Sequence, residues 1–86
     1  MSDWLLIGTA GCHLCEEAAE ILREAGLDFQ EAEIMDNPVW QARFALQIPV
    51  IHSEKSGVLL GWPFTAAQVQ AFITASQSHY SNPTQL

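Results

Sequence analysis

GTAGCHLCEE, residues 8–17, contains both cysteines of this 86-residue chain. The apolar run at residues 4–7 precedes it and is typical of a central strand that is covered on both faces. After Cys12 the apolar residues fall on one helical face, at Leu14, Ala18, Ile21, Leu22 and Ala25. Gly26 follows where a left-handed helix cap is expected. The pattern predicts a strand, a turn and a helix over residues 12–25 that begins at Cys12.

A cysteine at a helix start is favoured as a nucleophile. The unpaired backbone N–H groups and the positive end of the helix dipole at Cys12 favour a thiolate over a thiol. Cys15 lies one turn further along and on the same side, because residues three apart are neighbours on a helix. Its sulfur can therefore resolve a mixed disulfide formed at Cys12. The spacing predicts thiol–disulfide chemistry.

Three other roles are compatible with a pair of cysteines. A zinc site needs more ligands than two cysteines, and His13, His52 and His79 show no ligand-pair spacing. A purely structural disulfide across so short a loop removes little entropy from the unfolded chain. Two core cysteines at this spacing by chance remain an alternative.

Composition indicates one small globular domain. Apolar residues make up 49% of the chain and no linker or repeat interrupts them. We expect the domain to span residues 1–76 and to be followed by a frayed polar tail, residues 77–86, which contains Pro83. The net charge of -7 disfavours binding to nucleic acids or to anionic lipid surfaces.

The chain has no hydrophobic run of the ~20 residues that span a bilayer. Its first residues, Met1-Ser2-Asp3, lack the basic start of a signal peptide. We therefore expect a cytoplasmic protein. In that reducing compartment a lone CxxC pair is expected to cycle between dithiol and disulfide.

The remaining elements complete the order β-α-β-α-β-β-α. A loosely alternating strand is expected over residues 28–35, and then a helix opened by Asn37 and Pro38. Two short strands joined by a tight turn follow, so they are predicted to pair as an antiparallel hairpin. A last helix begins after Thr65 and ends near Ser76. The predicted segments are strands at 4–7, 28–35, 48–52 and 58–61 and helices at 12–25, 37–46 and 65–76.

This order, with a CxxC after the first strand and a proline opening the third, resembles the thioredoxin fold. The short length is most similar to a glutaredoxin, and residues 11–18, Asn37-Pro38 and Ile48-Pro49-Val50 resemble a bacterial group of glutaredoxin-like proteins. The resemblance implies an α/β fold with a four-stranded mixed sheet and helices on both faces. It covers about residues 4–76.

The resemblance also implies roles for single residues. Cys12 would be the nucleophile, Cys15 the resolving thiol and Pro49 a cis proline beside the sulfurs. Such a bond would turn the backbone N–H and C=O of Ile48 toward an extended substrate. Substrate contacts are expected at Gly11, His13, Ile48 and Pro49. The expected partner of this monomer is a protein or small-molecule disulfide, with no metal and no cofactor.

Two departures from glutaredoxins bear on glutathione. Ala10 stands two positions before Cys12, where glutathione-binding members carry a basic residue. Residues 61–65 hold no acid, although an acid after the fourth strand is usual. We expect weak or no glutathione specificity. His13 is either a cation that stabilises the Cys12 thiolate or an exposed residue without that role.

Two alternative functions remain open at this stage. The chain could be a thioredoxin-fold binding module that docks a peptide beside Pro49 and leaves its cysteines idle. It could also be a metal or iron–sulfur carrier that uses Cys12 and Cys15 across a dimer.

Overall fold

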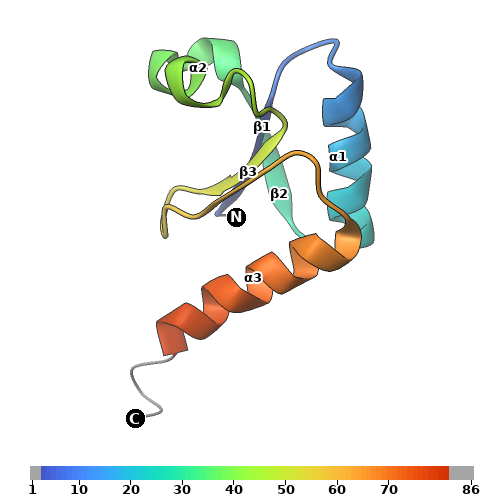
Figure 1. The fold of residues 1–86 in the computed structure, drawn as a ribbon, viewed down its shortest axis with the longest axis vertical. Helices are drawn as coiled ribbons and strands as arrows, with labels where there is room; N and C mark the ends of the chain where they lie inside the picture. Colours follow the sequence, from blue (N-terminus) through green and yellow to red (C-terminus); the bar gives the residue numbers. More distant parts are fainter. Residues whose placement is uncertain (1–2, 82–86) are drawn as a thin grey trace.

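The computed structural model describes residues 3–81, with side chains described through Ser76. Its elements follow the predicted order, with one added 3-10 turn (Figure 1). They are β1 (Trp4–Gly8), α1 (His13–Glu24), β2 (Phe29–Glu33), η1 (Ile34–Asp36), α2 (Pro38–Phe44), β3 (Val50–Ser53), β4 (Leu59–Gly61) and α3 (Ala66–Ser81). Within these residues no helix is both long enough and apolar enough to cross a membrane.

The four strands form one mixed sheet in the order β2-β1-β3-β4. β1 pairs in parallel with β2, whereas β1 with β3 and β3 with β4 are antiparallel. Helix α1 connects the parallel pair, as a crossover connection must. The predicted α/β thioredoxin-like fold is confirmed.

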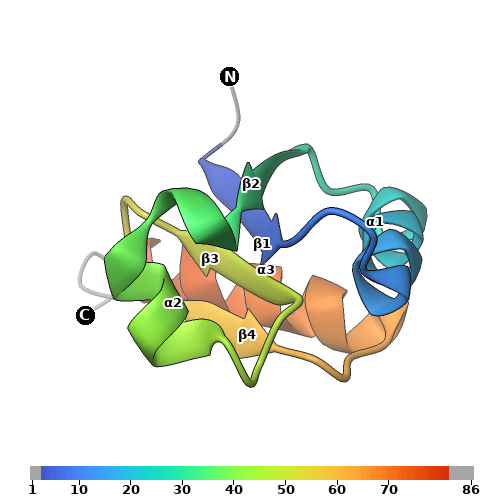
Figure 2. The same ribbon diagram turned by 90° about the horizontal axis from the view of Figure 1, so that it is seen from above.

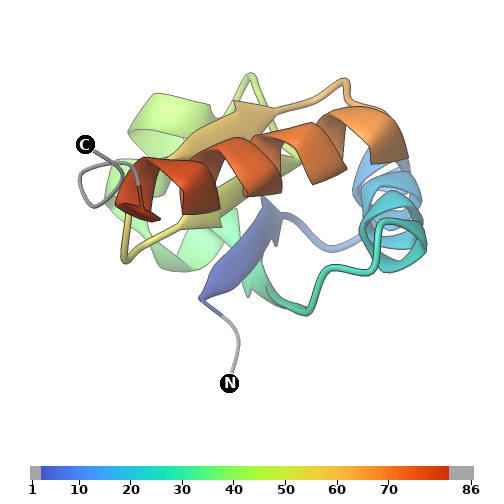
Figure 3. The same ribbon diagram turned by 90° about the horizontal axis from the view of Figure 1, so that it is seen from below.

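Each face of the sheet has its own apolar cluster. On one face Leu6 and Ile51 pack with α1 and α3, and on the other Ile7 and Val50 pack with α2. Figures 2 and 3 show α2 and α3 on opposite sides of the sheet. Because successive strand residues point to opposite faces, β1 must be apolar throughout to serve both clusters. This explains the uninterrupted run at residues 4–7.

Short polar residues define where the helices begin. The Asn37 side chain accepts hydrogen bonds from the backbone N–H groups of Val39 and Trp40, at 3.0 and 3.2 Å. Thr65 and Gln68 form a reciprocal capping box, with bonds of 3.2 and 2.8 Å. The predicted caps at Asn37 and Thr65 are present.

The C-terminal boundary differs from the prediction. Helix α3 continues to Ser81, so residues 77–81 are helical and do not form the start of a frayed tail. The reason is that no glycine or proline interrupts the chain from Ala66 to Ser81, and the first helix breaker is Pro83. Residues 82–86 of the predicted tail lie outside the described residues.

Three other boundaries lie two residues from their predicted positions. β2 ends at Glu33 because Ile34–Asp36 turns into η1, α2 ends at Phe44, and β3 begins at Val50 after Pro49. Both the Ile48–Pro49 and the Trp62–Pro63 peptide bonds are cis, and the second of these was not predicted.

Candidate active site

A tight turn after β1 places Cys12 at the start of α1. The Cys12 N–H donates to the Thr9 carbonyl at 3.2 Å, and Gly11 has φ of 77°, a conformation that L residues rarely adopt. Cys12 itself is extended, with φ -83° and ψ 113°, as an N-cap residue should be. Gly11 therefore has a local backbone role that fixes where the first sulfur lies.

The Cys12 sulfur replaces the oxygen that usually caps a helix. Its Sγ accepts a hydrogen bond from the Cys15 backbone N–H at 3.2 Å. A donor and a helix N-terminus directed at one sulfur favour negative charge on that atom. Cys12 is partly accessible, and neither cysteine is in a disulfide. The first sulfur thus has the surroundings of a nucleophile.

The second sulfur lies in a different environment. Burial raises the pKa of Cys15 to about 11, and a hydrogen bond to the Cys12 side chain adds to the effect. The Thr9 backbone N–H opposes this rise by donating to the Cys15 sulfur. Cys15 therefore stays a thiol at neutral pH.

Gly8 makes room for Cys15. A Cβ atom at this position would lie 2.5 Å from the Cys15 Sγ and 3.1 Å from its Cβ. Real side chains do not approach so closely, so any larger residue would displace the sulfur. The sequence predicts Gly8 only as part of the turn after the first strand, whereas the structure places it at the end of β1, where its missing side chain admits Cys15.

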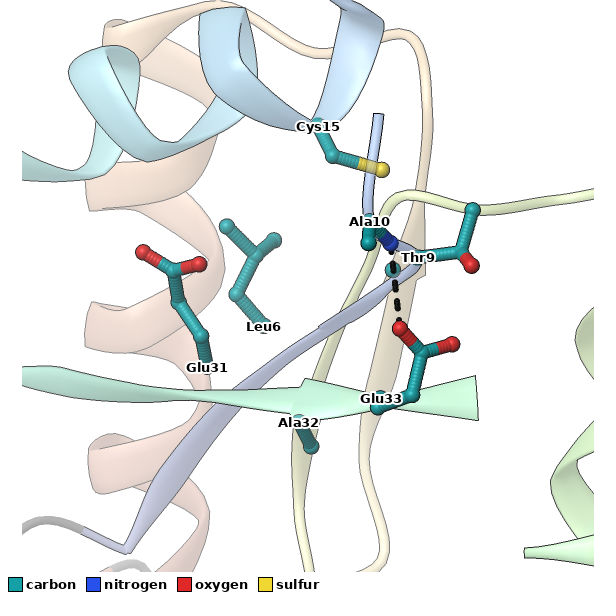
Figure 4. A pocket seen from close by; sticks show the side chains of 8 residues that line it. Leu6, Thr9, Ala10, Cys15, Glu31, Ala32 and Glu33 are labelled. Atoms are coloured by element: carbon teal, nitrogen blue, oxygen red, sulfur yellow. Dashed lines mark hydrogen bonds between the residues drawn. The ribbon is translucent and has the colours of Figure 1, made fainter. Parts of the chain in front are cut away.

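Glu33 ties the end of β2 to the loop that carries the cysteines. Its carboxylate accepts a hydrogen bond from the Ala10 backbone N–H at 3.0 Å (Figure 4). It accepts a second from the Met35 backbone N–H at 3.1 Å. The Met35 bond, with a further bond from the Thr9 side chain, lowers the pKa of Glu33. The sequence predicts only a loosely alternating strand around Glu33 and gives no sign of this contact. The signal that would have found it is the parallel pairing of the two strands, which sets Gly8 opposite Glu33.

Two adjoining hollows open beside the sulfurs. One of about 270 Å³ lies between β1, β2 and Cys15, and the second, about 370 Å³, reaches Cys12 and runs along α1. Thr9, Ala10, Cys15 and Glu31 line both. In Figure 4 the Cys15 sulfur points toward the Thr9–Ala10 segment, above the Glu33 carboxylate.

The predicted substrate residues do not all gather at these hollows. Gly11 lines the second hollow with Cys12. The His13 side chain is 83% exposed and its Nε2 lies 3.1 Å from the Glu17 carboxylate, so it points to solvent from the first turn of α1. Ile48 and Pro49 line neither hollow. They precede β3 on the other side of β1.

Pro49 nevertheless lies level with the cysteine loop. The antiparallel register ends with Ile7 paired to Val50, and Gly8 and Pro49 are the next residues beyond that pair on the two chains. Pro49 is buried, and its carbonyl accepts the Trp62 N–H at 3.0 Å. The expectation for Ile48 was wrong in one respect. Its N–H donates to the Phe44 carbonyl at 3.1 Å, because the chain leaves α2 in a tight turn, and so it is not turned toward a substrate.

Among residues 3–76 no three His, Cys, Asp or Glu side chains come together as a metal site. Cys12 and Cys15 both line the second hollow. The remaining side chains around them are carboxylates, small residues and Arg23.

Comparison with known proteins identifies the family. The family model described as Glutaredoxin-like domain (DUF836) matches residues 4–74. The chain belongs to this glutaredoxin-like family. The X-ray structure of Northeast Structural Genomics target protein XcR50 from X. campestris is similar, with 32% identity and a TM-score of 0.75 over 84% of this chain and 96% of that one. Its solution structure gives 32% identity and a TM-score of 0.73, over 87% and 95%. A search of curated proteins finds no match.

The two thiols of this glutaredoxin-like chain should differ in reactivity. At neutral pH we expect Cys12 to be alkylated much faster than Cys15, because a thiol with a pKa of about 11 is ionised in roughly one molecule in ten thousand. The rate at Cys15 should rise with pH until about 11. Brief labelling with iodoacetamide, followed by peptide mass spectrometry, measures both. Equal rates at neutral pH would contradict this assignment.

Replacing Gly8 by alanine should displace Cys15. We expect a loss of about 1–3 kcal/mol in the free energy of unfolding, as for other overpacked sites, and altered labelling of Cys15. Gly61→Ala is the matched control, because a Cβ there meets the Gln47 Cβ and carbonyl at an ordinary 3.7 Å. Denaturant unfolding of both variants makes the comparison. Equal free energies of unfolding for the two variants would contradict the prediction, because they would show that Cys15 can move away from a Cβ at position 8 without loss of stability.

Proposed function

We propose that this protein is a thiol–disulfide oxidoreductase in which Cys12 is the nucleophile and Cys15 the resolving thiol. The observation that carries the proposal is the cap of α1, where the Cys12 sulfur accepts the Cys15 N–H at 3.2 Å. The same interaction favours charge on one sulfur and holds the other within reach. Membership of a glutaredoxin-like family supports this chemistry.

The reaction has two exchange steps. The Cys12 thiolate attacks one sulfur of a substrate disulfide, a mixed disulfide forms, and the other substrate sulfur leaves as a thiolate that takes up a proton. Cys15 then loses its proton to solvent and attacks the Cys12 sulfur. The Cys12–Cys15 disulfide forms and the second substrate thiol is released. The protein dithiol supplies both electrons, and an external thiol must later restore it.

The surroundings of Cys15 make the second step depend on the first. The pKa of Cys15 is raised in part by a hydrogen bond to Cys12 and by the charge on Cys12. Both causes require that Cys12 is not bonded to a substrate sulfur. Once Cys12 is in a mixed disulfide, both are lost, and the Thr9 N–H still favours the Cys15 thiolate. The resolving thiol therefore becomes more acidic only when it is needed.

We place the substrate chain against the loop before β3. Pro49 lies level with Gly8, and the Ile48 carbonyl, rather than its N–H, is the backbone group proposed to bind an extended substrate. Gly11 lies beside Cys12 and admits a substrate sulfur without a side chain in the way. His13, exposed beside Glu17, contributes to the rim. These roles fit a protein or small-molecule disulfide in a reducing compartment such as the cytoplasm.

Turnover of a small disulfide tests the proposal directly. The wild-type protein should consume the disulfide when a thioredoxin-type reducing system supplies electrons. Cys12→Ser should abolish turnover while leaving the fold intact, because serine is an efficient helix cap. An unchanged rate in Cys12→Ser would rule out the proposed nucleophile.

Cys15→Ser should form mixed disulfides and fail to resolve them. Attack requires a single thiolate, whereas release without an outside thiol requires the second. Incubation with a protein disulfide should therefore trap a covalent adduct, visible by non-reducing electrophoresis and by mass spectrometry. Release of the substrate at the wild-type rate, with no added thiol, would show that Cys15 does not resolve the adduct.

Glutathione should be a poor electron donor. Glutaredoxins hold it with charged contacts, and hydrogen bonds to charged groups contribute about 1.5–3 kcal/mol each. Here Ala10 replaces the expected cation, and the hollow beside Cys12 is lined by Glu16, Glu20 and Glu31. Each missing contact weakens binding by about tenfold to a hundredfold. We expect the rate of reduction to rise without saturation in the low millimolar range.

A coupled assay with glutathione reductase measures this dependence. Saturation below one millimolar would contradict the expectation. Arg23, a cation that lines the hollow with Cys12, would then be the first residue to replace. Arg43→Gln is the control, because Arg43, like Arg23, lies over an aromatic ring but lines neither hollow.

A further inference from the structure

Glu33 contacts the cysteine loop from a neighbouring strand. Its carboxylate binds the Ala10 N–H at 3.0 Å, the Met35 N–H at 3.1 Å and the Thr9 side chain. Ala10 is distant from Glu33 in sequence, so these bonds join the end of β2 to the turn after β1. Thr9 is also the residue whose backbone N–H donates to the Cys15 sulfur. One carboxylate thus holds both ends of the segment that touches the resolving thiol.

We propose that Glu33 is a positioning residue for disulfide exchange: its carboxylate holds Thr9 and Ala10 so that the Thr9 backbone N–H stays directed at the Cys15 sulfur. The proposal rests on the oxidoreductase function proposed above and assigns a residue to its second step. The hollow between β1, β2 and Cys15 is the place where these groups meet (Figure 4).

Glu33 does not serve as the proton acceptor for Cys15. Its pKa is lowered by the hydrogen bonds that it receives, whereas that of the free Cys15 thiol is about 11. A carboxylate so much less basic than the thiolate would hold the proton in a minute fraction of molecules. Its acceptor sites are also taken by the Ala10 and Met35 N–H groups and the Thr9 hydroxyl. The carboxylate therefore acts through the loop.

Two effects of Glu33 on Cys15 have opposite signs. Its negative charge disfavours the Cys15 thiolate, while the Thr9 N–H that it positions favours the thiolate. The charge of Glu33 is the smallest of the causes acting on Cys15, and the Thr9 bond is larger. Loss of the carboxylate should therefore raise the pKa of Cys15 in the mixed disulfide, although removal of a negative charge alone would lower it. The direction of the shift separates the two effects.

The control variant must account for the other charged groups around Cys15. Those that line the two hollows with it are Glu31 and Glu33 from β2, and Glu16, Glu20 and Arg23 from α1. β1 contributes Leu6, Gly8 and the loop residues Thr9 and Ala10, none of which titrates. Glu31 lines the same hollows, lies on the same strand and is exposed. Glu31→Gln removes the same charge and leaves the bonds to the cysteine loop in place.

The experiment follows both steps with dipyridyl disulfide, an uncharged probe, mixed in equimolar amount with the reduced protein. Cys12 attack releases one pyridinethione, and resolution by Cys15 releases the second, so absorbance records two phases. For Glu33→Gln we expect the second phase to slow about threefold to tenfold at neutral pH, with its pH midpoint shifted upward by about half a unit to one unit. Glu31→Gln should leave the midpoint unchanged or shift it downward.

Several outcomes would overturn the positioning role. They are an unshifted midpoint in Glu33→Gln, a downward shift, or the same shift in Glu31→Gln. Glutamine retains one acceptor oxygen that could still hold the Ala10 N–H, so Glu33→Ala, which removes every bond to the loop, is measured beside it and should show at least the same upward shift. The thermal unfolding of both variants is compared with that of Glu31→Gln. Failure of the underlying function has a different signature, because the wild-type protein itself would then lack the first or the second phase.

Discussion

The hydrogen bond from the Cys15 N–H to the Cys12 sulfur is the contact on which the site depends. It caps α1 and ties the Cys12 sulfur to the backbone of Cys15. The two thiols are unequal because burial raises the pKa of Cys15. The turn through Gly11 presents the first sulfur, and the missing side chain of Gly8 admits the second. The rest of the fold holds this arrangement in place by fixing α1 on the sheet.

The sheet performs that task through its two unlike faces. Leu6 and Ile51 anchor α1 and α3, and Ile7 and Val50 anchor α2 on the other side. The loop that joins β1 to α1 emerges between Glu33 at the end of β2 and Pro49 before β3. The cysteine pair is thus bordered by a carboxylate on one side and by a cis proline on the other.

Local patterns in the sequence predicted most of this fold. The apolar run of β1, the helical face after Cys12 and the caps at Asn37 and Thr65 are set by neighbours in the chain, so each could be read from a short window. The polar residues after Ser76 predict a frayed end, but α3 extends to Ser81 because no glycine or proline interrupts it there. Gly8 and Glu33 were missed because their roles arise from a crossover pairing and from a close contact across it. The N–H of Ile48 was misjudged because its partner, Phe44, belongs to the end of the preceding helix.

In the proposed oxidoreductase, the cap at Cys12 would also link the redox state of the two cysteines to the conformational stability of the chain. A sulfur that carries negative charge is a better acceptor for the Cys15 N–H than a sulfur in a disulfide, so α1 begins more firmly in the dithiol form. By a thermodynamic cycle, an interaction that stabilises the folded dithiol relative to the disulfide makes the dithiol a weaker reductant by the same free energy. Under the proposed function, the geometry of a single helix end would affect both the stability of the reduced chain and how strongly its two cysteines hold their electrons.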